Sequence, residues 1–171
     1  LAINSIDGVM AATRHDLFPV RAGDVVCGTR VIPLVIEEEK ILEAERAAGG
    51  TPVLALFEYR PMKAGIVTTG GEVFHGRIED TFTPVVVEKL KPYGIEAAFF
   101  ARADDRVENI LEAIRSARAQ GADLVLCTGG MSVDPDDRTP AAIRLSGAEI
   151  VTYGAPVLPG AMFLLGYYGD G

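Results

Sequence analysis

The chain has 171 residues, and its 16 lysines and arginines against 24 aspartates and glutamates give a formal net charge of −8 at pH 7. This balance argues against a nucleic-acid-binding protein, which needs a clustered basic surface to displace counterions from phosphates. A hydrophobic fraction of 49% with 23% charged residues is typical of a packed globular chain, and no apolar run reaches the roughly 18 residues of a membrane span. We therefore expect a soluble protein that binds neither nucleic acid nor a membrane.

The two ends and the two cysteines predict the context of the chain. It begins at Leu1 without an initiator methionine or a signal peptide, and it stops at Gly171 directly after an apolar run. We interpret it as a piece of a longer protein, truncated at its carboxyl end. Cys27 and Cys127 lie in separate apolar, strand-like runs, which predicts two buried, reduced thiols and a cytoplasmic location.

Residues 1–60 predict a small β-rich segment with one helix. A turn at Gly23-Asp24 precedes a β-rich run from Val25 to Ile32. Apolar residues at positions 41, 42, 44, 47 and 48 predict a helix near residues 36–48, and the two glycines that follow end it. A short strand is then expected from Val53 to Phe57.

Residues 61–171 predict an α/β domain. Apolar, strand-like runs at residues 65–69, 95–100 and 123–128 alternate with helical patterns that begin near Pro84, Arg106 and Pro140. This alternation predicts right-handed βαβ units and a three-layer α/β/α fold with a mostly parallel sheet. Sheets of this kind bind ligands at the carboxyl ends of their strands.

Two of the three predicted strands end in the same tripeptide. The first is followed by Thr69-Gly70-Gly71, and the third by Thr128-Gly129-Gly130 with Met131-Ser132 after it. Glycines after a strand let backbone N–H groups approach an anion closely, and a neighbouring hydroxyl adds a donor. The same sequence is also found in ordinary turns, so the pattern alone leaves both interpretations open.

Acidic residues follow all three strands, and helix capping does not account for all of them. Thr139 before Pro140 fits the N-cap of the last helix, which leaves Asp137 free. Thr83 before Pro84 fits the N-cap of the first helix, which leaves Glu72 and Asp80 free.

Two aspartates follow the middle strand, and only one is needed for capping. Asp105 and Glu108 have the spacing of a capping box, so Asp104 is available for another role. Glu72, Asp104 and Asp137 are then expected to converge from three strand ends, an arrangement that fits a Mg²⁺ site or a general base for phosphate chemistry.

These residues resemble a known family, the molybdopterin-binding domain of molybdenum-cofactor biosynthesis proteins. The resemblance covers about residues 62–171 and rests on several motifs in the same order: Gly65-Ile-Val-Thr-Thr-Gly-Gly-Glu72, Ile78-Glu-Asp-Thr81, Arg102-Ala-Asp-Asp105, Cys127-Thr-Gly-Gly-Met-Ser-Val133, Asp137-Arg-Thr-Pro140 and Leu158-Pro-Gly-Ala161.

The resemblance implies a domain that holds molybdopterin, a phosphorylated pterin dithiolene, in some members together with AMP and Mg²⁺. One branch, molybdopterin adenylyltransferase, activates the phosphate with ATP, and another, molybdopterin molybdotransferase, inserts molybdate. It places catalytic and metal-binding roles on Glu72, Asp104 and Asp137. It also implies homo-oligomers, either dimers or trimers, and other molybdenum-cofactor proteins as partners. The ligand-binding positions that it implies are Thr69, Gly70, Gly71, Asp80, Thr128, Gly129, Gly130, Met131, Ser132, Pro159 and Gly160.

The sequence also departs from the family pattern. Gly71 stands where the molybdotransferase branch has an acidic residue, and Leu158 and Ala161 replace the lysines that flank its Pro-Gly turn. The loss of cations that hold anions favours a second hypothesis, a non-catalytic carrier or sensor of the cofactor. A flavodoxin-like electron-transfer module is a third and more distant alternative.

Overall fold

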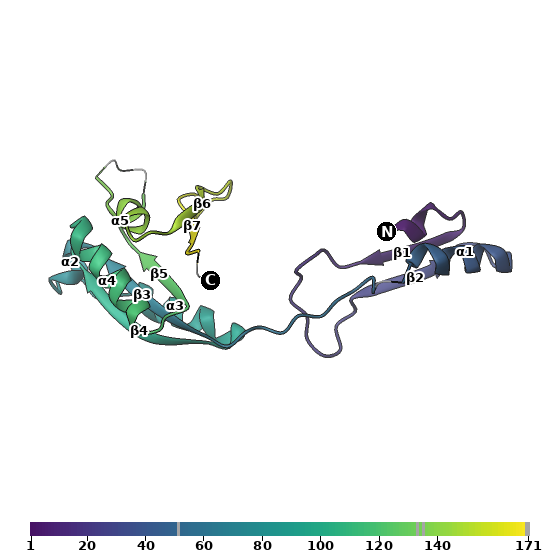
Figure 1. Ribbon diagram of the computed structural model, residues 1–171, viewed down its shortest axis with the longest axis horizontal. Helices are drawn as coiled ribbons and strands as arrows, with labels where there is room; N and C mark the ends of the chain where they lie inside the picture. Colours follow the sequence, from purple (N-terminus) through teal and green to yellow (C-terminus); the bar gives the residue numbers. More distant parts are fainter. Residues whose placement is uncertain (51, 133, 135, 170–171) are drawn as a thin grey trace. The chain divides into compact units, whose positions relative to one another are not determined.

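The structure is a computed structural model that describes residues 1–50, 52–132, 134 and 136–169. The chain divides into two compact units, Leu1–Phe57 and Glu58–Gly171, which are described separately (Figure 1). No helix in the described part of the chain is both long enough and apolar enough to cross a bilayer.

The first unit is a two-stranded antiparallel ribbon with two helical segments. A 3₁₀ turn at Ala2–Ser5 precedes β1 (Val9–Thr13), which pairs with β2 (Cys27–Val31), and α1 covers Glu38–Ala48. The predicted helix is therefore present. Residues 52–57 form no strand, and the prediction of one there is wrong.

The first cysteine was also placed wrongly by the sequence. Every residue of β2 is exposed, so Cys27 is accessible and not buried. The apolar run around it resembles a core strand, but a two-stranded ribbon has too few neighbours to cover both of its faces.

The second unit contains a parallel sheet with the strand order β4-β3-β5. The strands are β3 (Met62–Thr69), β4 (Ile95–Ala103) and β5 (Leu124–Thr128). Between β3 and β4 lie a short α2 (Gly71–Phe74), α3 (Phe82–Leu90) and a 3₁₀ turn (Lys91–Tyr93), and α4 (Val107–Ala119) connects β4 to β5. The α/β fold with a parallel sheet, predicted from the alternating pattern, is confirmed.

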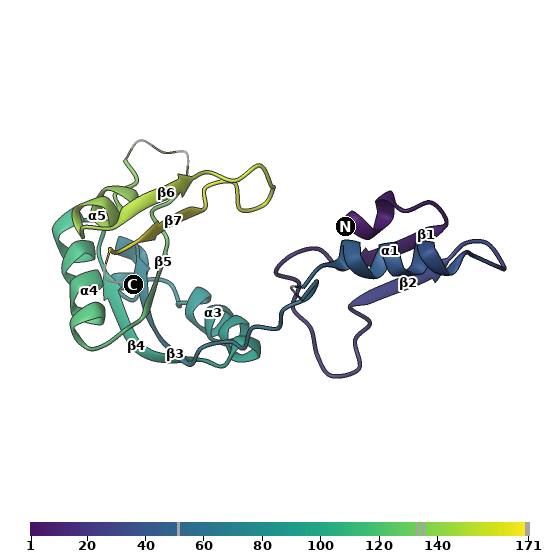
Figure 2. The ribbon, with the colours of Figure 1, turned by 45° about the vertical axis from the view of Figure 1, so that its right-hand side comes forward.

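Helices cover both faces of this sheet. Adjacent residues of a strand point to opposite faces, and Val67 packs with Ile110 and Ile114 of α4, whereas Ile66 packs with Leu90 of α3. Figure 2 shows α4 and α5 (Thr139–Leu145) close together, with α3 apart from them. The result is the predicted three-layer arrangement.

The last part of the chain adds a feature that the sequence pattern did not predict. β6 (Glu149–Tyr153) and β7 (Leu164–Tyr167) form an antiparallel pair after α5 (Figure 2). Tyr168, which follows β7, contacts residues of two helices. Its hydroxyl lies 2.6 Å from Oγ of Ser146 at the end of α5, and the guanidinium of Arg118 in α4 lies over its ring. This fixes the β6–β7 pair against the end of α5 and the α4 helix.

Candidate functional site

The two Thr-Gly-Gly turns lie at the same edge of the sheet. We call Thr69–Gly71 the β3 turn and Thr128–Gly130 the β5 turn. β3 and β5 are parallel neighbours, paired up to Thr68 and Thr128, so their carboxyl ends meet. The Thr69 hydroxyl bridges the turns by donating to the Thr128 carbonyl over 3.1 Å.

The β5 turn can be built only with glycines. Gly129 has a φ of +91°, and a Cβ added there would lie 2.3 Å from the Thr69 carbonyl oxygen. Gly130 has a φ of +56°, and its Cβ would lie 2.7 Å from the Thr139 hydroxyl. Both the backbone conformation and the close approach therefore require the absence of a side chain.

Thr139 holds this turn in place instead of capping α5, as the sequence had suggested. It is the first residue of α5, is fully buried, and donates from its hydroxyl to the Gly129 carbonyl over 3.0 Å. The same hydroxyl lies 3.1 Å from that of Thr69. Thr139 follows Gly129 by ten residues, and nothing in the sequence apart from its place before Pro140 marked it out. Its contact with the Gly129 carbonyl was therefore not predicted.

The β5 turn has unused hydrogen-bonding groups. Thr128 Oγ1 is buried and has no hydrogen-bond partner among the described residues. In the same part of the chain, no backbone carbonyl accepts from the N–H groups of Gly129 and Gly130. Unpaired buried polar atoms are uncommon because they cost free energy, and the Thr128 hydroxyl is such an atom beside two N–H groups without a described acceptor. This makes the β5 turn the candidate ligand site.

The donors of the β3 turn are used within the protein. The Gly70 N–H donates to the Ala103 carbonyl over 3.1 Å, and the Gly71 N–H donates to Asp105 Oδ2 over 2.8 Å. Glu72 follows at the start of α2, where its exposed side chain makes no hydrogen bond or ion pair with the described residues.

Asp104 and Asp105 have exchanged the roles that the sequence suggested. Asp104 supports the start of α4, because its carboxylate accepts from the Arg106 N–H, from Asn109 Nδ2 and from Arg106 Nε. Burial opposes ionisation of Asp104, but these hydrogen bonds and the Arg106 charge outweigh it and lower the pKa of the carboxyl. Asp105 does not cap α4 in this way and contacts the β3 turn instead.

Asp80 is also engaged in a helix start, contrary to the prediction that Thr83 would leave it free. Its Oδ1 accepts from the N–H groups of Phe82 and Thr83, and its Oδ2 accepts from the hydroxyls of Thr83 and Thr68. Burial opposes ionisation, but these four hydrogen bonds outweigh it and lower the pKa of Asp80. Asp80 therefore connects β3 to the start of α3.

Asp137 lies in the loop that follows the β5 turn. Its carboxylate accepts from the N–H of Ser132, and its own N–H donates to the Asp134 carbonyl over 3.1 Å. The sequence predicted that Asp137 does not cap α5, and its side chain makes no cap hydrogen bond to that helix. Met131 and Ser132 continue the loop, and Val133 of the predicted motif lies outside the described residues.

The remaining predicted residues do not gather into one site. Within residues 1–50, 52–132, 134 and 136–169, no three His, Cys, Asp or Glu side chains are grouped so that they could hold a metal ion. Glu72, Asp104 and Asp137 are thus not brought together as a metal centre, since Asp104 turns toward α4. Pro159 and Gly160 lie between β6 and β7, and no hydrogen bond joins them to the β3 or β5 turn in the described part of the chain.

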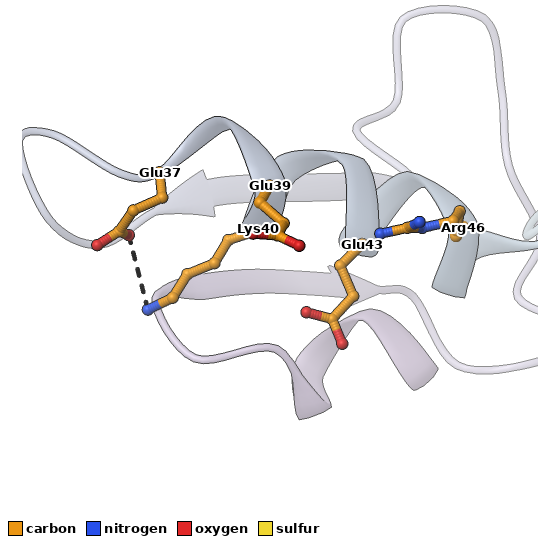
Figure 3. A pocket seen from close by; sticks show the side chains of 5 residues that line it. All are labelled: Glu37, Glu39, Lys40, Glu43 and Arg46. Atoms are coloured by element: carbon orange, nitrogen blue, oxygen red, sulfur yellow. Dashed lines mark ion pairs between the residues drawn. The ribbon is translucent and has the colours of Figure 1, made fainter.

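A surface hollow in the first unit does not resemble a binding site. It is lined by residues of one helix and its start: Glu37, Glu39, Lys40, Glu43 and Arg46 (Figure 3). Lys40 is already paired, at 3.8 Å from Glu37 and 3.2 Å from Asp7. These are charges on an exposed helix surface, and the β5 turn remains the candidate site.

Known proteins resemble the second unit. Residues 65–167 match the family model described as a probable molybdopterin binding domain. A segment of 90 residues is 37% identical to a CinA-like protein of Mycobacterium sp. (strain MCS), a match that covers 52% of this chain and 21% of that relative. A CinA-like protein of Mycobacterium avium (strain 104) gives the same values. The matched segment therefore spans about a fifth of these curated relatives.

Solved structures also resemble part of this chain. The molybdopterin biosynthesis enzyme MoaB of Thermus thermophilus is 28% identical, with a TM-score of 0.56 over 63% of this chain and 76% of that chain. The tungsten cofactor synthesizing protein MoaB of Pyrococcus furiosus is 27% identical, with a TM-score of 0.50 over 54% of this chain and 57% of that chain.

Proposed function

The chain belongs to the family of probable molybdopterin binding domains, and from that premise we propose that its second unit binds molybdopterin with the pterin phosphate at the β5 turn. The observation that carries this proposal is the unfilled donor set of that turn. Thr128 Oγ1 has no partner in the described part of the chain, and Gly129 and Gly130 expose backbone where no side chain fits. Backbone N–H groups and a hydroxyl at a strand end are the groups that hold phosphates in many α/β proteins.

The surrounding charge supports a role for a cation. The chain carries a net charge of −8. Glu72, in the first turn of α2, and Asp137, in the loop after the β5 turn, follow strands that end at the carboxyl edge of the sheet. A phosphorylated ligand at this edge would be repelled unless a divalent cation or N–H groups intervened. Mg²⁺ in proteins is commonly held by one or two carboxylates together with substrate phosphates, so Glu72 and Asp137 are the residues that would share it with the ligand.

The reaction that we propose is a Mg²⁺-assisted transfer at the pterin phosphate, either adenylyl transfer from ATP with AMP held at the site or insertion of molybdate. Mg²⁺, when bound, would neutralise charge on the phosphate. Asp137 would keep its carboxylate in place through the Ser132 N–H, and Glu72 would contribute a carboxylate that no other described group occupies.

A second candidate is a non-catalytic carrier or sensor of the finished cofactor. It is favoured by the absence, among the described residues, of a cluster of three acids that could hold a metal. Leu158 and Ala161, which carry no charge beside the Pro-Gly turn, favour it as well.

Two measurements test these proposals. Calorimetry of the chain with molybdopterin should show binding in the presence of Mg²⁺, and no binding would contradict the proposed function. Assays with ATP or with molybdate then separate the candidates, because binding without turnover supports the carrier.

The variant Asp137→Asn sharpens the second measurement. An amide oxygen can still accept from the Ser132 N–H, so stability should change little while transfer is lost. Asp136→Asn is the matched control, since it removes the same charge one residue away from Asp137. The Asp136 side chain is exposed and pairs with Arg138. Full transfer activity in Asp137→Asn would refute the catalytic role.

The cellular setting is proposed as well. We expect a cytoplasmic homo-oligomer that meets other molybdenum-cofactor proteins, and light scattering of the purified chain tests the oligomeric state.

A further inference from the structure

The β3 and β5 turns have the same sequence and lie at the same edge, but only one of them has unused donors. At the β5 turn, no described backbone carbonyl accepts from the N–H groups of Gly129 and Gly130. At the β3 turn, the Gly71 N–H donates to the Asp105 carboxylate over 2.8 Å. The Gly70 N–H donates to the Ala103 carbonyl over 3.1 Å, so the Asp105 carboxylate is the one side chain that fills a donor of the β3 turn in the described part of the chain.

Asp105 reaches this position from the connection between β4 and α4. Its neighbour Asp104 holds the start of α4 through Arg106 and Asn109, which leaves Asp105 to point toward β3. The Asp105 side chain is exposed and makes no other hydrogen bond or ion pair with the described residues. Its contact with Gly71 is therefore its one polar contact in the described chain.

The glycine at position 71 fits this contact. Gly71 does not have a left-handed φ, so its backbone conformation does not require glycine. A Cβ at this position would lie 2.9 Å from Asp105 Oδ2. Gly71 leaves room for the carboxylate, at the position where the sequence departs from the acidic residue of the molybdotransferase branch.

We propose that Asp105 is a positioning residue that closes the β3 turn to anions and so directs the phosphate of the ligand to the β5 turn. This inference rests on the proposed function. The carboxylate occupies the Gly71 N–H that would otherwise be available to an anion, and its negative charge repels a second anion at the same place. The β5 turn has no such carboxylate on its glycines in the described part of the chain.

The test uses inorganic phosphate as the probe and the backbone amides as the readout. The 171-residue chain is labelled with ¹⁵N and titrated with phosphate at constant ionic strength. In the unmodified chain, phosphate should shift the Gly129 and Gly130 amides and leave Gly71 unchanged. In Asp105→Ala, phosphate should shift Gly71 as well, and exchange of the Gly71 amide should become about tenfold faster as its charged acceptor is lost.

Three further variants make the interpretation specific. Asp105→Asn keeps an acceptor for the Gly71 N–H, so Gly71 should remain insensitive to phosphate. Gly71→Ala displaces a flexible carboxylate and not backbone, so the chain should fold and the amide of residue 71 should exchange faster, as in Asp105→Ala. Glu108→Ala is the matched control, because it removes a nearby charge in the first turn of α4 with no contact to Gly71.

The outcomes separate this inference from the proposed function. Shifts at Gly129 and Gly130 with no phosphate effect on Gly71 in Asp105→Ala would overturn the role of Asp105 and leave the proposed function intact. No shift at Gly129 and Gly130 in the unmodified chain would contradict the proposed phosphate site, and the inference would fall with it. A Gly71 shift in the unmodified chain would overturn the inference directly.

Discussion

The close approach of the two turns can be tested at Gly129. Gly129 and Gly121 have nearly the same φ, with values of +91° and +93°, but a Cβ at Gly121 meets nothing within 4 Å. At Gly129 the Cβ would lie 2.3 Å from the Thr69 carbonyl oxygen. The pair Gly129→Ala and Gly121→Ala therefore separates steric conflict from backbone strain.

The magnitudes follow from these two terms. Both variants place alanine in a left-handed conformation, which costs about 1–2 kcal/mol. Gly129→Ala must also displace the end of β3, and overpacking of this kind typically costs about 1–3 kcal/mol more. Gly129→Ala should thus be less stable than Gly121→Ala by about 1–3 kcal/mol, and it should also lose pterin binding.

Urea unfolding followed by tyrosine fluorescence measures the difference. All five tyrosines, Tyr59, Tyr93, Tyr153, Tyr167 and Tyr168, belong to the second unit, so the signal reports that unit. Equal slopes with different midpoints would identify a change in stability and not in the unfolded state. Equal midpoints for the two variants would refute the steric argument, and retained pterin binding by Gly129→Ala would refute the placement of the ligand at the β5 turn.

Three other predictions concern hydroxyls, pH and thiols. Thr128→Val removes a hydroxyl with no described partner, so stability should hold while ligand affinity falls. Thr139→Val leaves the Gly129 carbonyl unpaired, so urea unfolding should show a loss of about 1–3 kcal/mol of stability. Equal losses of stability in the two variants would contradict this difference. Because the folded pKa of Asp80 is lowered, its carboxylate contributes stability that is complete above its unfolded pKa, 3.8, and is lost as the pH falls through the folded pKa. Asp80→Asn should therefore weaken the pH dependence of unfolding stability below about pH 4. An unchanged pH dependence in this range would argue against the role of Asp80. Cys27 is exposed and should react at once with a thiol reagent at pH 8. Cys127 is half-buried, and burial raises the pKa of its thiol to about 12, so it should react much more slowly until urea unfolds the chain. Equally rapid reaction of the two thiols in the folded chain would contradict this difference.

The parallel sheet was predictable because its signals are local and strong. β3 has six successive buried residues, Ala64 to Thr69, and glycines follow it directly, so length and punctuation alone identify a core strand. The pair β6–β7 was not predicted because its strands are only five and four residues long and contain no fully buried residue. Cys27 was misplaced because an apolar run does not reveal whether enough neighbours exist to cover it.

The candidate site was predictable in its position but not in its detailed contacts. The carboxyl edge of a parallel sheet and the two Thr-Gly-Gly sequences pointed to the strand ends, where the unused donors lie. Spacing could not decide between Asp104 and Asp105, because the choice depends on which side chain turns toward Asn109 and which toward Gly71. Asp80 was misassigned for the same reason, since a loop aspartate and a threonine three residues later compete for one helix start.

The difference between the two turns shows where the chemistry of this edge is set. Identical tripeptides would bind identical anions if their glycines acted alone. The Gly129 carbonyl is instead occupied by the Thr139 hydroxyl, and the Gly71 N–H by the Asp105 carboxylate. In the described part of the chain, the β5 turn therefore has a carbonyl satisfied and its glycine N–H groups unused, whereas the β3 turn has one glycine N–H paired with the Ala103 carbonyl and the other with the Asp105 carboxylate. These partners come from α5 and from the β4–α4 connection, so under the proposed role of Asp105 the anion preference of this edge would depend on residues that no Thr-Gly-Gly motif contains.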